Sequence, residues 1–313
     1  MLRTILVPLD GSPTAEDAVP MASRLARRRG ASVELVLVRE APTEPLTVLS
    51  RSAEVKRMDE DDQRLAEEYL ESVAARMREK TGAEVRGVAL EGEVIGSLRE
   101  RVESTGAELV AMCTHGRGGW SRFWLGSVAQ ELVRRVQVPL LLTRPHGPEE
   151  GQASPPPMDA PLRVLVTLDG SQYAEQALDA AIRVFGEESR YRLLRVVVPP
   201  VVHGYRVPKA HPDYVEQEKL TARATEYLSG QVEKLRERGL EVDSDVIARQ
   251  HVAEGISDYA REEGMHTVAI ATNARQGMPR LVLGSVADKV LRSSSVPVLV
   301  TRSPSAGRVP AGA

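Results

Sequence analysis

Short apolar runs alternate with longer segments of helical periodicity along the whole chain. In the first half these runs are residues 4–9, 32–38, 83–90, 107–113 and 138–143. Each run is too short for a buried helix, and the segments between them place apolar residues three or four positions apart. Strands that are apolar throughout and are separated by helices are typical of a parallel sheet covered on both faces. The pattern therefore predicts an α/β fold.

The first helical stripe contains an irregularity. Apolar residues recur from Ala15 to Ala26 at the spacing of a helix face, and Ser12 followed by Pro13 is a plausible start. Pro20 lies inside the stripe. Because proline lacks the backbone N–H and clashes with the preceding turn, we expect a bend in the helix at this point.

The second half of the chain repeats the first. Two stretches return: ILVPLDGS (5–12) as VLVTLDGS (164–171), and LGSVAQELVRRVQVPLLLTR (125–144) as LGSVADKVLRSSSVPVLVTR (283–302). Asp10 and Asp169 are 159 positions apart, and Gly126 and Gly284 are 158 apart, so the copies are collinear apart from small insertions. A period of this length indicates a duplicated domain rather than a solenoid. We expect domains at 1–144 and 162–303, a Pro- and Gly-rich linker at 145–161 and a flexible tail at 304–313.

Composition excludes several classes of protein. Lys and Arg number 41 against 44 Asp and Glu, a net charge of −3, so no basic field is available for nucleic acid. Aromatic residues make up only 4%, which argues against a base-stacking surface. Cys113 is the only cysteine, which excludes a disulfide framework. No apolar segment is long enough for a signal peptide or a membrane span, and we expect a soluble, cytoplasmic protein that does not bind membranes.

The candidate chemistry lies at the ends of the predicted strands. Ligands of open parallel sheets bind beyond the carboxyl ends of the strands, where the strand order reverses. Asp10 follows the first strand, and a Gly-rich loop follows the fourth and leads through Gly126 and Ser127 into a helix. Glycines permit close approach to phosphate, the helix N-terminus offers free N–H groups, and a carboxylate suits a ribose hydroxyl or a cation. These residues indicate a nucleotide site, although Asp10 could equally cap a turn and Gly126 could serve tight packing.

At these residues the chain resembles the universal stress protein family. The resemblance rests on ILVPLDGS, on the stretch THGRGGWSRFWLGSVAQELVRRVQVPLLLT, and on their second copies, and it covers nearly the whole chain. Nucleotide-binding members of the family carry the motif G-x2-G-x9-G-[ST]. The resemblance implies two tandem doubly wound domains, each with a five-stranded parallel sheet of order 3-2-1-4-5 flanked by helices. It also implies binding of an adenine nucleotide, usually ATP, with the need for Mg²⁺ left open.

The resemblance also assigns site residues and partners. In the first copy the implied nucleotide-binding residues are Pro8, Leu9, Asp10, Val38, Met112, His115, Gly116, Gly126, Ser127 and Val128. In the second copy they are Thr167, Leu168, Asp169, Val196, Gly284, Ser285 and Val286. The last strands of the two copies, 138–143 and 296–301, are apolar edges that we expect to pair within the chain as a pseudo-dimer, and two chains are expected to associate further as a homodimer.

Both copies depart from the family motif. Its first glycine is Cys113 in the first copy, and in the second copy its first two glycines are Ala271 and Ala274 and the histidine is Asn273. We therefore expect weaker binding in the second copy. No P-loop, HExxH, CxxC or GxSxG motif occurs, so we expect a nucleotide-binding stress-response or signalling module rather than a dedicated enzyme. A nucleotide-free interaction scaffold and a slow ATP hydrolase are the alternatives.

Overall fold

The computed structural model divides the chain into two compact units, Met1–Pro148 and Glu149–Ala313. It describes residues 2–40, 53–114, 125–145, 157–158, 160–199, 212–272 and 284–302. Most of the predicted linker 145–161 and all of the predicted tail 304–313 lie outside the described residues. The linker and tail therefore stay predictions.

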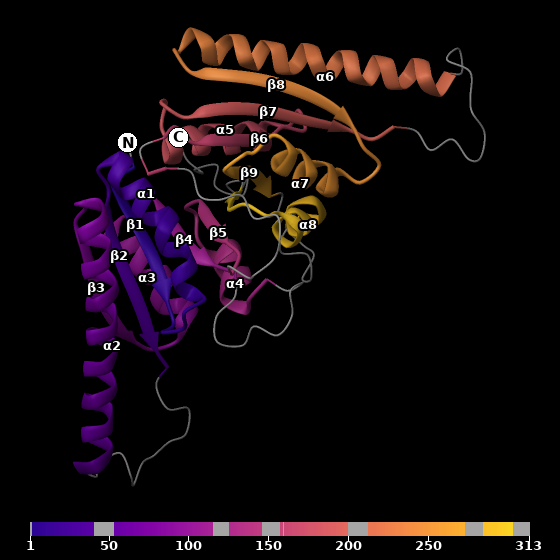
Figure 1. Cartoon of the computed structure of the whole chain (residues 1–313). Coiled ribbons are helices and arrows are strands. Elements are labelled where there is room, and N and C mark those ends of the chain that lie inside the picture. Colours follow the sequence, from indigo (N-terminus) through magenta and orange to yellow (C-terminus); the bar gives the residue numbers. More distant parts are fainter. Residues whose placement is uncertain are drawn as a thin grey trace, which may run out of the picture. The chain divides into compact units, whose positions relative to one another are not determined.

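Unit 1 alternates strands and helices from end to end (Figure 1). Its elements are β1 (Thr4–Leu9), the 3-10 turn η1 (Ala15–Ala18), α1 (Val19–Arg29), β2 (Ser32–Arg39), α2 (Ala53–Thr81), β3 (Val85–Glu91), α3 (Val94–Thr105), β4 (Leu109–Cys113), α4 (Ser127–Arg135) and β5 (Leu140–Thr143). The strands lie in the order β3-β2-β1-β4-β5, and each neighbouring pair is parallel.

Unit 2 has the same plan. Its elements are β6 (Arg163–Thr167), α5 (Gln172–Phe185), β7 (Arg190–Val197), α6 (Pro212–Glu237), β8 (Glu241–Ala248), α7 (Val252–Glu262), β9 (Thr267–Thr272), α8 (Ser285–Ser293) and β10 (Val298–Arg302). The parallel order is β8-β7-β6-β9-β10. Counted within its own unit, each sheet has the order 3-2-1-4-5, and the predicted doubly wound α/β fold is confirmed.

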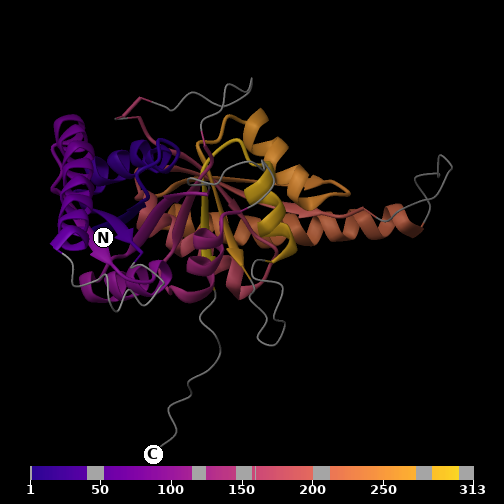
Figure 2. The same ribbon diagram turned by 90° about the horizontal axis from the view of Figure 1, so that it is seen from below.

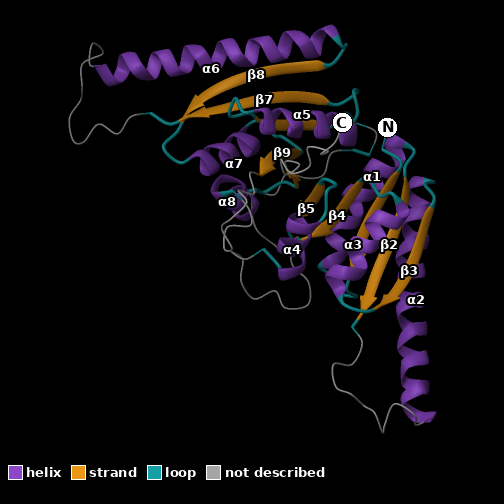
Figure 3. Ribbon diagram, turned by 180° about the vertical axis from the view of Figure 1, so that it is seen from behind, coloured by secondary structure: helices purple, strands orange, loops and turns teal. Residues whose placement is uncertain are grey.

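Helices cover both faces of each sheet (Figure 3). In unit 1, α1 packs against α2 on one face and α3 packs against α4 on the other. In unit 2, α7 packs against α8, whereas α6 covers β7 and β8. Burial on both faces explains the apolar runs, since Ile5, Leu6 and Val7 of the central strand β1 are all fully inaccessible to solvent.

Pro20 begins a helix instead of bending one. The apolar stripe predicted as a single bent helix forms two pieces, η1 followed by α1, and Pro20 lies in the first turn of α1. The N–H groups of the first turn have no partner within the helix, so proline loses nothing there. Ser12 accepts the N–H of Ala15 through its hydroxyl, at 3.2 Å, and so assists the start of η1.

The helices that precede the edge strands are longer than the strands they cover. α6 has 26 residues and β8 has 8, which correspond to about 39 Å of helix and about 26 Å of strand. Figures 1 and 2 show α6 running past the end of β8. Because α6 is antiparallel to β8, its first turns extend beyond the carboxyl ends of the strands. Within the described residues, no helix is both long and apolar enough to cross a membrane.

Candidate functional site

The turn after β1 holds Asp10 at the point where the strand order reverses. β1 lies between β2 and β4, and the chain leaves β1 toward one side of the sheet and later returns to the other. Asp10 Oδ1 accepts the backbone N–H of Ser12 at 2.9 Å and the Ser12 hydroxyl at 2.5 Å. Gly11 has a φ of +80°, a conformation that a side chain would disfavour. The carboxylate is thus fixed at the carboxyl end of the sheet by its own turn.

Unit 2 reproduces this turn closely. Asp169 Oδ1 accepts the N–H of Ser171 at 2.9 Å and its hydroxyl at 2.6 Å, and Gly170 has a φ of +87°. The Ser171 hydroxyl accepts the N–H of Ala174 at 3.2 Å, which caps the start of α5. The turn-forming role that the sequence allowed for these carboxylates is therefore present in both units. These turn bonds use only Oδ1 of each aspartate, so they do not prevent Oδ2 from binding a ligand.

The start of α4 is held against the end of β4. The Gly126 N–H donates to the carbonyl oxygen of Thr114 at 2.8 Å, and a Cβ added to Gly126 would lie 2.7 Å from the same oxygen. No side chain fits at that distance without a backbone shift, so the close packing that the sequence allowed for Gly126 is also real. It fixes the first turn of α4 next to the strand end.

Glycine stands at the N-cap of both α4 and α8. Helix α3 is capped by Glu93 and α5 by Ser171, whereas Gly126 and Gly284 bring no side chain to the first turn that follows. Among the described residues, no side chain caps α4 or α8. The N–H groups of such a turn, with the positive end of the helix dipole, form an anion-binding arrangement. Ser127, the first residue of α4, is exposed and adds a hydroxyl.

The other predicted site residues gather at the same strand ends. Pro8 and Leu9 end β1, Val38 is the penultimate residue of β2, and Met112 is the penultimate residue of β4. In unit 2 the corresponding positions are Thr167 at the end of β6, Leu168 next to it, and Val196 near the end of β7. Val128 and Val286 are the second residues of α4 and α8, and Ser285 is the first of α8. His115 and Gly116 lie outside the described residues, as do Asn273 and Ala274.

A tyrosine lies near each of these turns, and no sequence motif singled it out. The hydroxyl of Tyr69 in α2 is buried near Glu16 of η1. Burial, and then the charge of Glu16, raises the pKa of Tyr69 above its ordinary value. In unit 2 the Tyr227 hydroxyl donates to Glu175 at 2.9 Å, and burial followed by this hydrogen bond raises the pKa of Tyr227. Both phenols therefore stay neutral at physiological pH.

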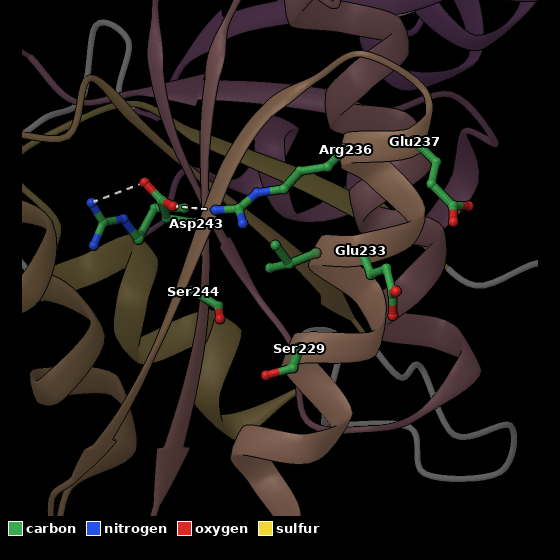
Figure 4. A pocket seen from close by; sticks show the side chains of 8 residues that line it. Ser229, Glu233, Arg236, Glu237, Asp243 and Ser244 are labelled. Atoms are coloured by element: carbon green, nitrogen blue, oxygen red, sulfur yellow. Dashed lines mark hydrogen bonds and ion pairs between the residues drawn. The ribbon is translucent and has the colours of Figure 1, made fainter.

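A pocket elsewhere in unit 2 does not fit the predicted chemistry. It has a volume of about 670 Å³ and is lined by Arg192, Ser229, Val232, Glu233, Arg236, Glu237, Asp243 and Ser244. These residues lie in the first half of β7 and β8 and the last turns of α6, at the amino ends of the strands. Figure 4 shows Arg236 turned toward Asp243, and the two are 2.7 Å apart. Because its arginines are neutralised by neighbouring acids, the pocket offers no free charge to an anion.

Comparison with known proteins agrees with this fold and repeat. A protein of Mycolicibacterium smegmatis described as a universal stress protein is 28% identical over 301 residues, 95% of this chain and 96% of its own length. The universal stress protein Rv2005c of Mycobacterium tuberculosis is 31% identical over 230 residues, 72% of each chain. The crystal structure of a universal stress protein from Archaeoglobus fulgidus matches 96% of this chain and 99% of its own with a TM-score of 0.63, at 18% identity.

The profile of the universal stress protein family matches the chain twice, at residues 1–144 and 162–302. These two matches together span most of the sequence, and each contains one strand-end turn and one glycine-capped helix of the kind described above. The chain therefore belongs to the universal stress protein family, as a tandem member with two copies of the domain.

Proposed function

We propose that the protein binds an adenine nucleotide, with ATP as the expected ligand, at the carboxyl ends of β1 and β4 in unit 1. The observation that supports this most is the start of α4. There Gly126 holds an uncapped helix N-terminus against the strand end, in the same unit as the fixed Asp10 carboxylate. An anionic phosphate chain would complete the first turn of α4, and a ribose hydroxyl would donate to Asp10.

The remaining residues would complete the site. Pro8, Leu9 and Val38 would contact the adenine, and Ser127 would add a hydroxyl hydrogen bond to a phosphate. Met112, His115, Gly116 and Val128 would complete the phosphate side by virtue of the family resemblance alone. Unit 2 would bind with the corresponding residues but more weakly, because Ala271 and Ala274 replace the first two motif glycines there, whereas unit 1 keeps the second as Gly116.

The proposed role is that of a nucleotide-dependent binding or signalling module in the cytoplasm. Hydrolysis would require a positioned water and a base beside the phosphates, whereas Asp10 is a single carboxylate whose proposed partner is the ribose. The competing proposal is a nucleotide-free interaction scaffold. It is favoured by Cys113 in the first copy and by Ala271 and Ala274 in the second, which replace loop glycines of the family motif.

The first test is to denature freshly purified protein and identify any released nucleotide by chromatography with mass detection. About one ATP per chain would indicate one competent unit, and about two would indicate that both bind. Titration of ATP into nucleotide-free protein, with and without Mg²⁺, follows. Both tryptophans of the chain, Trp120 and Trp124, belong to the loop of the first copy, so their fluorescence reports that copy alone. Absence of nucleotide and of added-back binding would favour the scaffold.

A single substitution separates binding from folding. Asp at position 127, in the first turn of α4, should stabilise the helix through its dipole but repel a phosphate. We expect Ser127→Asp to keep or raise the melting temperature and to reduce ATP affinity at least about tenfold, whereas the neutral isostere Ser127→Asn should bind nearly normally. Ser285→Asp tests α8 of unit 2 in the same way. Equal ATP affinity in the Asp and Asn variants would contradict the site.

The pseudo-dimer is proposed on the apolar composition of the last strands, residues 138–143 and 296–301. Pairing of β5 with β10 would remove two apolar edges that invite association. A protease site placed in the linker 145–161 tests it, because the cut halves of a pseudo-dimer should still elute together on size exclusion. Two folded halves that separate would refute the pairing. Light scattering on the uncut chain tests the proposed homodimer.

A further inference from the structure

Arg195 of β7 lies against the turn that holds Asp169. A Cβ built on Gly170 would be 3.1 Å from Arg195 Nη1, so the guanidinium covers the residue between Asp169 and Ser171. Arg195 is the sixth residue of β7, directly before Val196, which the sequence placed in the nucleotide site. The side chain is half-buried. A fixed positive charge therefore stands at the carboxyl end of the sheet in unit 2.

This guanidinium has no acidic partner in the part of the chain that the structure describes. Two other half-buried arginines of unit 2 are paired: Arg192 with Asp245 at 2.6 Å, and Arg292 with Asp288 at 2.8 Å. Arg195 makes no hydrogen bond or ion pair among the described residues, although a guanidinium carries five N–H donors. Since partly buried donors are normally satisfied, an unpaired arginine beside a strand-end turn is suited to an external anion.

An aromatic platform orients the arginine. The guanidinium carbon of Arg195 lies 5.6 Å from the centroid of the Tyr227 ring, within the range of a cation–π contact. Glu175 Oε1 accepts the Tyr227 hydroxyl at 2.9 Å and the side-chain amide of Gln231 at 3.0 Å, which fixes the ring. Stacking leaves the N–H edge of the guanidinium available for a planar, two-point contact with phosphate.

Unit 1 lacks this arrangement. Leu37 occupies the position before Val38 that Arg195 occupies before Val196. Tyr69 is the counterpart of Tyr227, 158 positions earlier, and Glu16 turns to Arg76 at 2.6 Å. The arginine therefore distinguishes the unit whose loop has alanines in place of glycines.

We propose that Arg195 is a phosphate-binding residue of unit 2, which holds a phosphate group of the nucleotide at the ends of β6 and β7. The proposal rests on the nucleotide-binding function proposed above. The phosphate can belong to the 5′ chain or to the ribose itself. A ribose phosphate would lie closest, because Asp169 is the expected ribose ligand and an arginine near that position accommodates a 2′-phosphate in other doubly wound sites.

Methyl NMR on the full chain tests the proposal, because Val38 and Val196 report the two units separately. The probes are ATP, adenosine 2′,5′-bisphosphate, adenosine and inorganic pyrophosphate. The variants are Arg195→Leu, which copies unit 1, and Arg195→Lys, which keeps the charge and guards against a folding defect. At Val196 we expect Arg195→Leu to weaken at least one phosphorylated probe about tenfold or more and to leave adenosine unchanged. Val38 should respond as in the wild type.

The outcomes distinguish a ribose phosphate from a 5′ phosphate, and they distinguish failure of the Arg195 proposal from failure of the proposed nucleotide binding. A larger loss for the bisphosphate assigns Arg195 to a ribose phosphate, and a larger loss for ATP assigns it to the 5′ chain. Equal losses for all probes, adenosine included, or no loss at all, would overturn the anion role while leaving nucleotide binding in place. If the wild type binds no nucleotide, the proposed function fails, and the pyrophosphate titration then tests the anion site by itself. Pyrophosphate binding that is lost in Arg195→Leu would support an anion site at Arg195. No pyrophosphate binding, or binding that does not depend on Arg195, would refute that site.

Discussion

Replacement of Glu34 by Gln is expected to destabilise unit 1 by about 3 kcal/mol. Glu34 lies inside β2 with 1% of its side chain exposed. Its Oε2 accepts the Arg86 Nε–H at 2.6 Å, and its Oε1 accepts the Arg101 Nε–H at 2.5 Å. Arg86 comes from the edge strand β3 and Arg101 from α3, so one buried carboxylate joins three elements.

The magnitude follows from the difference in exposure of the three side chains. Removal of one partner from a buried ion pair costs about 3–5 kcal/mol, because the charge left behind is desolvated and unpaired. Arg86 is 58% exposed and Arg101 27%, so water can partly compensate both, which places the cost at the low end of that range. Gln keeps the shape of the side chain, removes its charge and replaces one of the two accepting oxygens with an N–H donor. The unfolding equilibrium of unit 1 should change by about two orders of magnitude.

Urea unfolding monitored by circular dichroism is a suitable assay, read as the transition of unit 1. Glu103→Gln is the matched control, because Glu103 is 71% exposed and lies 3.8 Å from Arg99 on the surface of α3. We expect the control to change stability by about 0.5 kcal/mol or less. Added salt should reduce the control effect but leave most of the Glu34 effect, since buried pairs are weakly screened. A Glu34→Gln protein as stable as the control would refute this reasoning.

Four further substitutions test local packing and capping. Gly87→Ala should cost about 1–3 kcal/mol of stability, because its Cβ would lie 2.7 Å from a side chain of α2. Gly230→Ala has open space around its Cβ and should stabilise α6 by up to about 1 kcal/mol. Thermal melting of both variants tests this contrast. Ser171→Ala removes the cap of α5 and should cost about 1 kcal/mol in chemical denaturation, and an unchanged midpoint would contradict that role. Hydrogen bonds from the N–H groups of Gly96 and Ile95 lower the pKa of Glu93 below its ordinary value. The stabilisation from Glu93 is therefore complete above the unfolded-state pKa and lost as pH falls through the lower folded value, so Glu93→Gln should flatten the acid limb of melting temperature against pH.

The sheet could be predicted because its inner strands are buried on both faces. A run such as residues 4–9 must be apolar along its whole length, and the repeat supplied each run twice. The role of Pro20 was harder to predict, since one apolar stripe continues through η1 and α1 without a change of period. Periodicity reports which face is buried, not which residue begins the helix.

The contacts that shape the candidate site were not predictable from spacing. The sequence presented Gly126 and Asp10 as site residues, but the 2.7 Å approach to the Thr114 carbonyl depends on how α4 meets β4 in space. The Arg195–Tyr227 contact joins residues 32 positions apart on different elements. A charged residue inside an apolar run, such as Glu34 or Arg195, was the available clue. It indicates a buried polar contact without identifying the partner.

The two units share the same turn at the strand ends but differ in the buried charges near the edges of their sheets. Arg192 stands 158 positions after Glu34 and has the opposite charge, and it faces acids instead of arginines. Asp243, which occupies the cross-strand position of Arg86, lies 4.0 Å from Arg192, and Asp245 accepts hydrogen bonds from Arg192, at 2.6 Å, and from Tyr259. A residue-by-residue comparison of the copies would count these as unrelated substitutions, yet each set is consistent only as a whole, because Glu34 placed beside Asp245 would bring two carboxylates together. The Asp turns, by contrast, keep the same bonds within 0.1 Å in both units. The buried charge near the sheet edge can therefore be an acid in one unit and a base in the other, provided that its partners have the opposite charge. The turn at the strand end, however, needs one particular geometry.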